Sequence, residues 1–429
     1  MRVRAGLTIL VASVLVTAVA CSSGGADRAA SPTTAPPASH HGAGQPVTTA
    51  APKASPKQLR AKLEQLLGQH VFLAVRSMRS VVSSPAELQQ AAGASVQENT
   101  DALAQLVASA YGSAEGQKFK DLWQQHVTDL SAYAKAVAGK DASAKQAARD
   151  ALMADGKAYG AWLAEASRDR VKAADAAAGV RVHLQDLMTQ LDAYAARDYP
   201  KAYRIERTAY EHMFTAGAGL AKGSVTPEVA VGLDAPPEKL RSAFAMLLGE
   251  HMELVIDAQR ATFAGAPEFQ AAAAQLNANS ATIAKAMGAI VGPKKAGEFQ
   301  AAWAHHVEGL MAHTAAVAGE DEAAEAAAEK DLSGGADRLA LFFSDVVKNE
   351  LPVEPLTAAI TMHDTHLIDH VAAYAAGDYT QAQHMEREGY QQMLAVANTL
   401  VGAIQKTVKP GLPVGGSQTG GGGTAHHSG

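Results

Sequence analysis

Cysteine is almost absent from this sequence, because Cys21 is the only one among 429 residues. A lone thiol cannot close an intramolecular disulfide, and the folded part has no thiolate metal site and no cysteine nucleophile. Basic clusters are also missing, and the formal net charge is -6 at pH 7. This charge argues against nucleic acid as a partner.

The motifs of common enzyme classes are missing as well. The chain has no His-Glu-x-x-His zinc peptidase motif, no Gly-x-Ser-x-Gly turn and no phosphate-binding glycine loop. No glutamate is followed by a histidine three residues later, as the ferritin-like di-iron bundles require. The sequence therefore predicts a protein that is not an enzyme.

The N-terminus has the pattern of a bacterial lipoprotein. Arg2 and Arg4 precede an apolar run over residues 7–19, which is typical of a secretory signal. The run is shorter than the roughly 20 apolar residues that cross a bilayer. The sequence Ala-Val-Ala-Cys at residues 18–21 resembles a lipobox, in which the cysteine is lipidated. We expect residues 1–20 to be a signal peptide and Cys21 to anchor the protein at the outer face of the cytoplasmic membrane. An ordinary signal peptide with an incidental cysteine is the alternative.

Two segments have a composition that does not support a packed core. Residues 21–56 consist mainly of Ser, Thr, Ala, Pro and Gly, and residues 410–429 are rich in Gly. Such segments bury too little apolar surface to offset the entropy lost on ordering. We expect a flexible linker after the lipid anchor and a disordered tail at the C-terminus.

The rest of the chain contains an internal duplication. Residues 181–222 align without a gap to residues 361–402, with 14 identities in 42 positions. The match continues upstream in two further pairs of segments: 119–127 with 299–307, and 66–70 with 247–251. A repeat of this length indicates two copies of one structural unit. We call residues 57–222 copy one and residues 238–409 copy two, joined by a linker at 223–237.

Each copy is predicted to be a helical bundle. The sequence is rich in Ala, Leu, Gln, Glu and Lys and lacks the alternation of apolar residues typical of strands. Short breaks between long helical segments force antiparallel neighbours. The fold class is therefore all-α, with two tandem up-and-down bundles. The helices expected in copy one are 56–82, 85–111, 114–138, 142–170, 173–196 and 199–221.

A polar layer is predicted midway along each bundle. Residues equally far from a turn lie at the same height in an antiparallel hairpin, because both helices rise 1.5 Å per residue. Counting from the turns places five residues of copy one at one level: His70, Asn99, His126, His183 and His212. The corresponding layer in copy two is His251, Asn279, His306, His363 and Gln392. These side chains are either hydrogen-bonded core residues or ligands of a metal ion.

Copy two carries additional histidines on one helix. His363, His366 and His370 have the spacing i, i+3 and i+7, which favours a stripe along one helix face. His384 follows on the next helix and is a candidate fourth ligand. Neutral imidazole binds copper and zinc, and nearby methionines favour copper. We expect a transition metal, copper first and zinc second. A solvent-facing stripe and haem binding through His and Met are the alternatives.

The duplicated segments also resemble a known group of proteins. Leu-Leu-Gly-x-His, Trp-x2-His and Asp-Tyr followed by Glu-Arg-x2-Tyr occur in both copies, and this pattern resembles secreted helical-bundle lipoproteins of high-GC Gram-positive bacteria. Some members carry a copper amine oxidase label, so the resemblance implies copper. The chain has no Asn-Tyr-Asp or Asn-Tyr-Glu tripeptide from which the oxidase's quinone forms, so that chemistry is not implied.

The sequence thus predicts an extracytoplasmic lipoprotein that binds a transition metal through its histidines. Its partners would be the membrane, through the lipid anchor, and an envelope protein whose identity is open. The alternative is a structural or protein-interaction lipoprotein in which the histidines are core polar residues.

Overall fold

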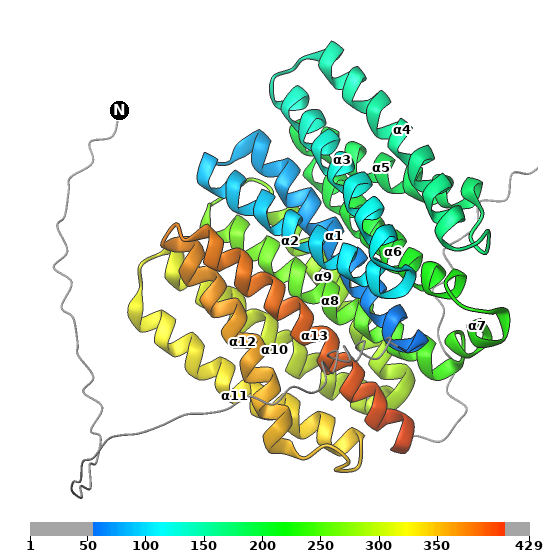
Figure 1. Ribbon diagram of the computed structural model, residues 1–429. Helices are drawn as coiled ribbons and strands as arrows, with labels where there is room; N and C mark the ends of the chain where they lie inside the picture. The colour runs from blue at the N-terminus through cyan, green and yellow to red at the C-terminus, as the bar shows by residue number, and fades with distance from the viewer. Residues whose placement is uncertain (1–54, 408–429) are drawn as a thin grey trace, which may run out of the picture. The chain divides into compact units, whose positions relative to one another are not determined.

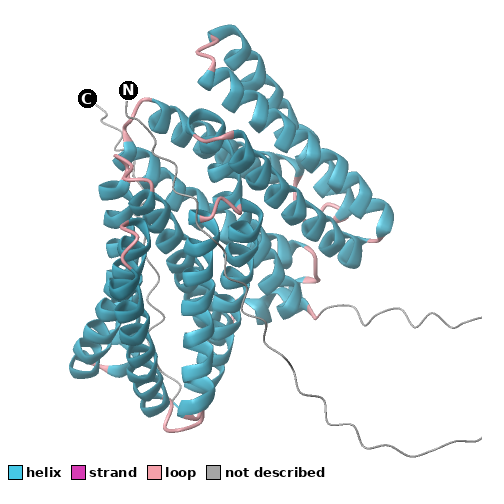
Figure 2. Cartoon of the chain, turned by 90° about the vertical axis from the view of Figure 1, so that its left-hand side faces the viewer, coloured by secondary structure: helices cyan, strands magenta, loops and turns pink. Residues whose placement is uncertain are grey.

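The computed structural model describes residues 55–407, and this part of the chain consists of helices joined by short loops (Figures 1 and 2). It contains thirteen helices and no strand within those residues, which confirms the all-α fold class. The predicted signal peptide, Cys21, the predicted linker up to residue 54 and the predicted C-terminal tail lie outside the described residues. No described helix is long and apolar enough to cross a membrane.

The helices repeat in the two copies. In copy one they are α1 (Pro56–Ser83), α2 (Ala86–Tyr111), α3 (Ser113–Ala138), α4 (Ala142–Ala166), α5 (Ala173–Ala195) and α6 (Tyr199–Gly223). In copy two they are α8 (Pro236–Phe263), α9 (Phe269–Val291), α10 (Pro293–Ala318), α11 (Glu322–Val346), α12 (Val353–Ala375) and α13 (Tyr379–Thr407). A short helix, α7 (Pro227–Leu233), occupies the segment expected to be a linker, and its Leu233 is buried.

One helix in each copy is surrounded by the others. Every residue from Leu63 to Arg76 of α1 is buried, as is every residue from Leu247 to Gln259 of α8. A helix that is buried all round must lie in the core. α1 packs against α2, α3, α5 and α6, whereas α4 packs mainly against α3 and α5. The central helices α1 and α8 therefore present side chains to several neighbours at once.

The two copies pack against each other through equivalent residues. The hydroxyl groups of Tyr210 and Tyr390, which occupy the same position in the two copies, are 3.2 Å apart. Both tyrosines lie against Gly68 and Gly249, where a Cβ atom would come within 2.9 Å of a tyrosine side chain. Contacts between equivalent residues are the signature of a two-fold arrangement. The described residues accordingly belong to one compact unit.

A buried ionic network joins the copies at the same interface. The guanidinium of Arg76 donates to Asp257 at 2.8 Å and to Glu386 at 2.6 Å, and it also pairs with Glu253. Burial raises the pKa of Glu253 to about 8, although Arg76 opposes this shift. Removing one partner of such a group leaves an uncompensated buried charge, which is strongly destabilising. The network therefore makes the relative position of the copies specific.

Helix α6 packs closely on α1 at Gly217. A Cβ atom at this position would lie 2.7 Å from the backbone nitrogen of Glu64, so Gly217→Ala forces the two helices apart. We expect a loss of about 1–3 kcal/mol in the free energy of unfolding, the usual cost of overpacking. Gly219 lies on the same helix with no atom within 4 Å of such a Cβ atom, so Gly219→Ala is the matched control. Alanine there should stabilise the helix by up to about 1 kcal/mol. Urea unfolding of both variants checks the prediction, and equal effects would contradict it.

Candidate metal centres

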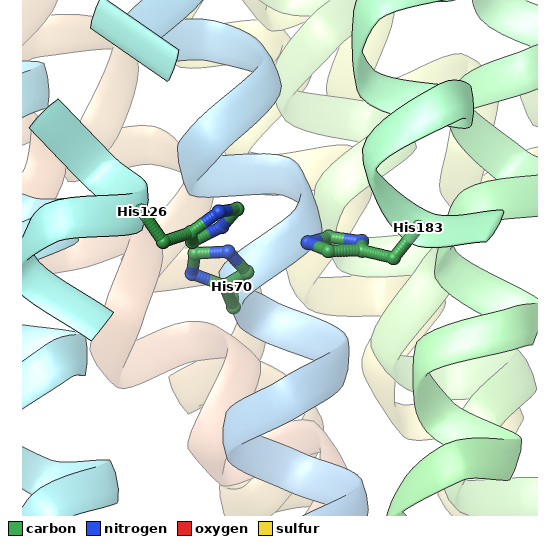
Figure 3. Close-up of side chains that lie close together, drawn as sticks. All are labelled: His70, His126 and His183. Carbon is green, nitrogen blue, oxygen red and sulfur yellow. The ribbon is translucent and has the colours of Figure 1, made fainter. Parts of the chain in front are cut away.

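Three histidines of copy one converge between three helices. His70 comes from α1, His126 from α3 and His183 from α5, and their rings point toward one another (Figure 3). The ring centroids are 5.4–5.7 Å apart, and one nitrogen from each ring lies within 4.8 Å of the other two. We call this group centre one. Its three members belong to the layer predicted from the sequence.

The rings of centre one are buried without hydrogen bonds. His70 is 0% exposed, His126 4% and His183 2%. Within the described residues, neither ring nitrogen of His70 or His183 has a hydrogen-bond partner, and nor has Nε2 of His126. The Trp123 ring covers one side, with its centroid 4.7 Å from that of His70. An unpartnered buried polar group costs about 1–3 kcal/mol, so three such rings together need an explanation.

Burial also fixes the protonation state of centre one. It lowers the pKa of His126 to about 4. The pKa values of His70 and His183 are also lowered well below the ordinary value, by burial first and then by the neighbouring imidazoles. All three rings are therefore neutral at pH 7, which is the form that coordinates metal ions.

Copy two contains the equivalent group, which we call centre two. His251 from α8, His306 from α10 and His363 from α12 have ring centroids 5.4–5.8 Å apart and nitrogens within 4.8 Å of one another. All three are buried, and neither ring nitrogen of His251 or His363 has a partner in the described part of the chain. Burial lowers the pKa of His306 to about 4 and that of the other two well below the ordinary value.

The two centres differ in one neighbouring side chain. Asp364 of copy two occupies the position of Leu184 in copy one, and both side chains are buried. Oδ1 of Asp364 lies 3.4 Å from Nδ1 of His306. Burial raises the pKa of this carboxyl group to about 8. Centre two therefore has a carboxyl group beside one of its imidazoles, where centre one has an apolar side chain.

Other members of the predicted layers lie elsewhere. Nδ1 of His212 is 2.7 Å from Asp186, and its side chain is 47% exposed, so it does not join centre one. The side-chain amides of Asn99 and Asn279 donate to the carbonyl groups of Leu66 and Leu247. In the same way, the amide of Gln392 donates to the carbonyl group of Ala359. These amides connect neighbouring helices at the level of the centres.

The four-histidine site predicted in copy two is not assembled. His363 belongs to centre two, but His370 lies seven residues further along α12, which corresponds to about 10 Å of helix rise. Nδ1 of His370 is 3.0 Å from the carbonyl oxygen of Ala382. His366 is only partly buried, and His384 is 47% exposed, with Glu388 as its nearest acidic neighbour. The rise along α12 thus places the three histidines of the stripe in different surroundings.

A cleft gives access to centre one. It has a volume of about 1050 Å³, and its lining includes His126, His183 and Met213. Met213 supplies a thioether, a soft donor that suits copper. An ion entering this cleft would therefore meet a thioether as well as two of the three imidazoles.

Comparison with protein-family models, with curated proteins and with solved structures gave no match. What the two centres bind is therefore inferred from their own residues. Each is a group of three buried, neutral imidazoles that could hold a metal ion.

Proposed function

We propose that this chain is a lipid-anchored extracytoplasmic protein that binds a transition-metal ion, copper first and zinc second, at centres one and two. The observation that carries the proposal is the presence of two equivalent triads of buried histidines whose ring nitrogens largely lack hydrogen-bond partners among the described residues. The location follows from the predicted signal peptide and lipobox and is part of the proposal.

The state of the ring nitrogens favours ligation over a structural role. Histidines that fix the register of a bundle would be expected to form hydrogen bonds, because unpartnered buried polar groups destabilise the fold. Nδ1 and Nε2 of both His70 and His251 lack such bonds within residues 55–407. A bound metal ion would use one nitrogen of each ring and offset part of that cost. Retention of this arrangement in both copies supports a shared function.

Charge favours monovalent copper at centre one. The cost of burying an ion in a medium of low dielectric rises with its charge, and three neutral imidazoles do nothing to reduce that charge. Leu184 occupies the position where centre two has Asp364. Burial raises the pKa of Asp364 to about 8, so a divalent ion at centre two would displace the proton of this carboxyl group and pair with the carboxylate, which centre one cannot offer.

Copper titration of the full chain tests the proposed function. Cys21 is replaced by Ser in all samples, so that its thiol cannot bind copper(I). Copper(I) is added under reducing conditions in competition with a chromogenic chelator, and zinc(II) is titrated in parallel. We expect two tightly bound copper(I) ions per chain. Binding no tighter than the micromolar level of ordinary surface histidines would contradict the proposal.

A matched control separates the centres from the terminal histidines. A variant in which all four terminal histidines are replaced by Ser should bind the same two copper(I) ions. The residues replaced are His40, His41, His426 and His427. Loss of the tight sites in this variant would assign copper binding to the terminal segments and would overturn the proposed function.

A further inference from the structure

A second difference between the copies lies on α10 and α11, away from centres one and two. In copy one, the hydroxyl group of buried Tyr133 donates to the carboxylate of Asp192 at 3.0 Å. Lys145 lies 2.7 Å from the same carboxylate. The phenol thus has a hydrogen-bond acceptor, and a lysine neutralises the charge of the accepting carboxylate.

Copy two replaces these three residues and also Arg149, which lies on α4 one turn after Lys145. The substitutions, from copy one to copy two, are Tyr133 to His313, Lys145 to Glu325, Arg149 to Glu329 and Asp192 to Ala372. The group changes from two cations with one anion to two anions with one imidazole. The formal charge of the acidic and lysine or arginine side chains in this group thus changes from +1 to -2. The helices that carry them are present in both copies.

The resulting side chains face one another across two helices. His313 is 1% exposed, and neither of its ring nitrogens has a hydrogen-bond partner among the described residues. Its Nε2 lies 3.6 Å from Oε1 of Glu329 and 3.9 Å from Oε1 of Glu325. One donor atom from each of the three residues lies within 4.8 Å of the other two. The buried imidazole is therefore aimed at a pair of carboxylates.

The two glutamates repel each other in the absence of a cation. Glu325 and Glu329 are four residues apart on α11, where like charges lie close together and destabilise the helix. Their side chains are 39% and 49% exposed, so a cation from solvent could reach both. A divalent cation held between them would remove the repulsion and supply a partner for His313.

We propose that His313, Glu325 and Glu329 form a third metal centre, confined to copy two, which binds zinc(II). Imidazole nitrogen and carboxylate oxygen are both ligands that zinc accepts, and a water molecule completes the coordination where the protein supplies three ligands. Copper(I) prefers softer donors than carboxylates, so this centre selects against it. The proposal is independent of centres one and two, because it shares no residue with them.

Zinc titration of two variants of the full chain tests the third centre. In the Glu325→Gln/Glu329→Gln double variant, both carboxylates become neutral amides of similar size on a half-exposed surface. We expect the number of zinc ions bound per chain to fall by one. The matched control is Glu322→Gln, which alters an exposed glutamate on the same helix outside the group. Its zinc binding should remain that of the parent protein.

A second pair of measurements keeps the third centre separate from the other two. The titrations are repeated in a His70→Leu/His251→Leu background, in which centres one and two lack a ligand. In that background, the protein with both glutamates should still bind the zinc ion of the third centre. The protein with Glu325→Gln and Glu329→Gln should not bind it. If the double glutamine variant binds as much zinc as the Glu322→Gln control in both backgrounds, the third centre does not exist.

Discussion

Replacing His70 by Leu should remove one of two copper(I) ions and should also make the metal-free protein more stable. His70 is one of the three histidines of centre one, and both of its ring nitrogens are buried without a partner in residues 55–407. Leucine has a similar volume and no polar atom. Replacing the imidazole by leucine therefore removes the cost of burying two unpartnered nitrogens. We expect the free energy of unfolding of the metal-free protein to rise by about 1–3 kcal/mol. Copper retained after chelator competition and urea unfolding measure the two effects.

The combination of effects separates a ligand from a structural residue. If His70 fixes the register of the bundle, His70→Leu should lower the free energy of unfolding and leave copper binding unchanged. His251→Leu is the equivalent change at centre two and should behave like His70→Leu. His212→Leu alters a half-exposed histidine of copy one outside the centre, so both copper ions should remain. A destabilised His70→Leu variant that still binds two copper ions would overturn the metal assignment.

Much of the helical architecture could be predicted from the sequence, because its signals are local. Proline, glycine and aspartate near the breaks placed most helix ends within two residues, while the end predicted at residue 170 lies at Ala166. One described element differs in kind from the prediction, because α7 is a short helix inside the segment predicted to be a linker. Leu233 gives that helix a buried contact, which its short sequence does not reveal.

The centres could be predicted only in part, because height along a helix does not define direction around it. His183 and His212 lie at similar distances from the turn at Asp198, and yet His183 points to the core and His212 to Asp186 near the surface. Counting residues from the turns gives the level correctly but cannot distinguish these two directions. In the histidine stripe of copy two the direction around the helix is similar, but the height along the helix differs. His363 and His370 lie on a similar face but too far apart along the axis to share an ion.

Positions that differ between the copies carried information that a comparison of identities overlooks. Around a two-fold axis a residue lies opposite its own equivalent, so an ion pair between equivalent positions requires opposite charges in the two copies. Arg76 occupies the position of Asp257 in the other copy, and these two side chains form an ion pair. Asp364 and the group around His313 are also differences between copies. Searching the duplication for positions that differ in charge would have pointed to the interface and to the group around His313.

Acidification should destabilise the metal-free protein through its buried histidines. His126 and His306 have pKa values of about 4 in the folded protein, against 6.5 for an exposed histidine. Between these values the unfolded chain binds more protons than the folded one, so the free energy of unfolding falls as pH decreases from about 6.5 to about 4. Each of these two histidines should account for about 3 kcal/mol over that range. Urea unfolding at intervals from pH 7.5 to 4.0 measures the loss.

The contribution of one histidine is isolated by comparing the parent protein with His126→Leu at each pH. Buried carboxyl groups act in the opposite direction, since burial raises the pKa of Glu206 to about 7 and that of Glu253 to about 8. Both proteins contain these groups, so their effect largely cancels in the difference. The variant should lose about 3 kcal/mol less than the parent protein by pH 4. Parallel pH profiles would mean that His126 is protonated as easily in the folded protein as in the unfolded chain. That result would contradict a neutral centre one and would remove the physical argument for copper(I) there.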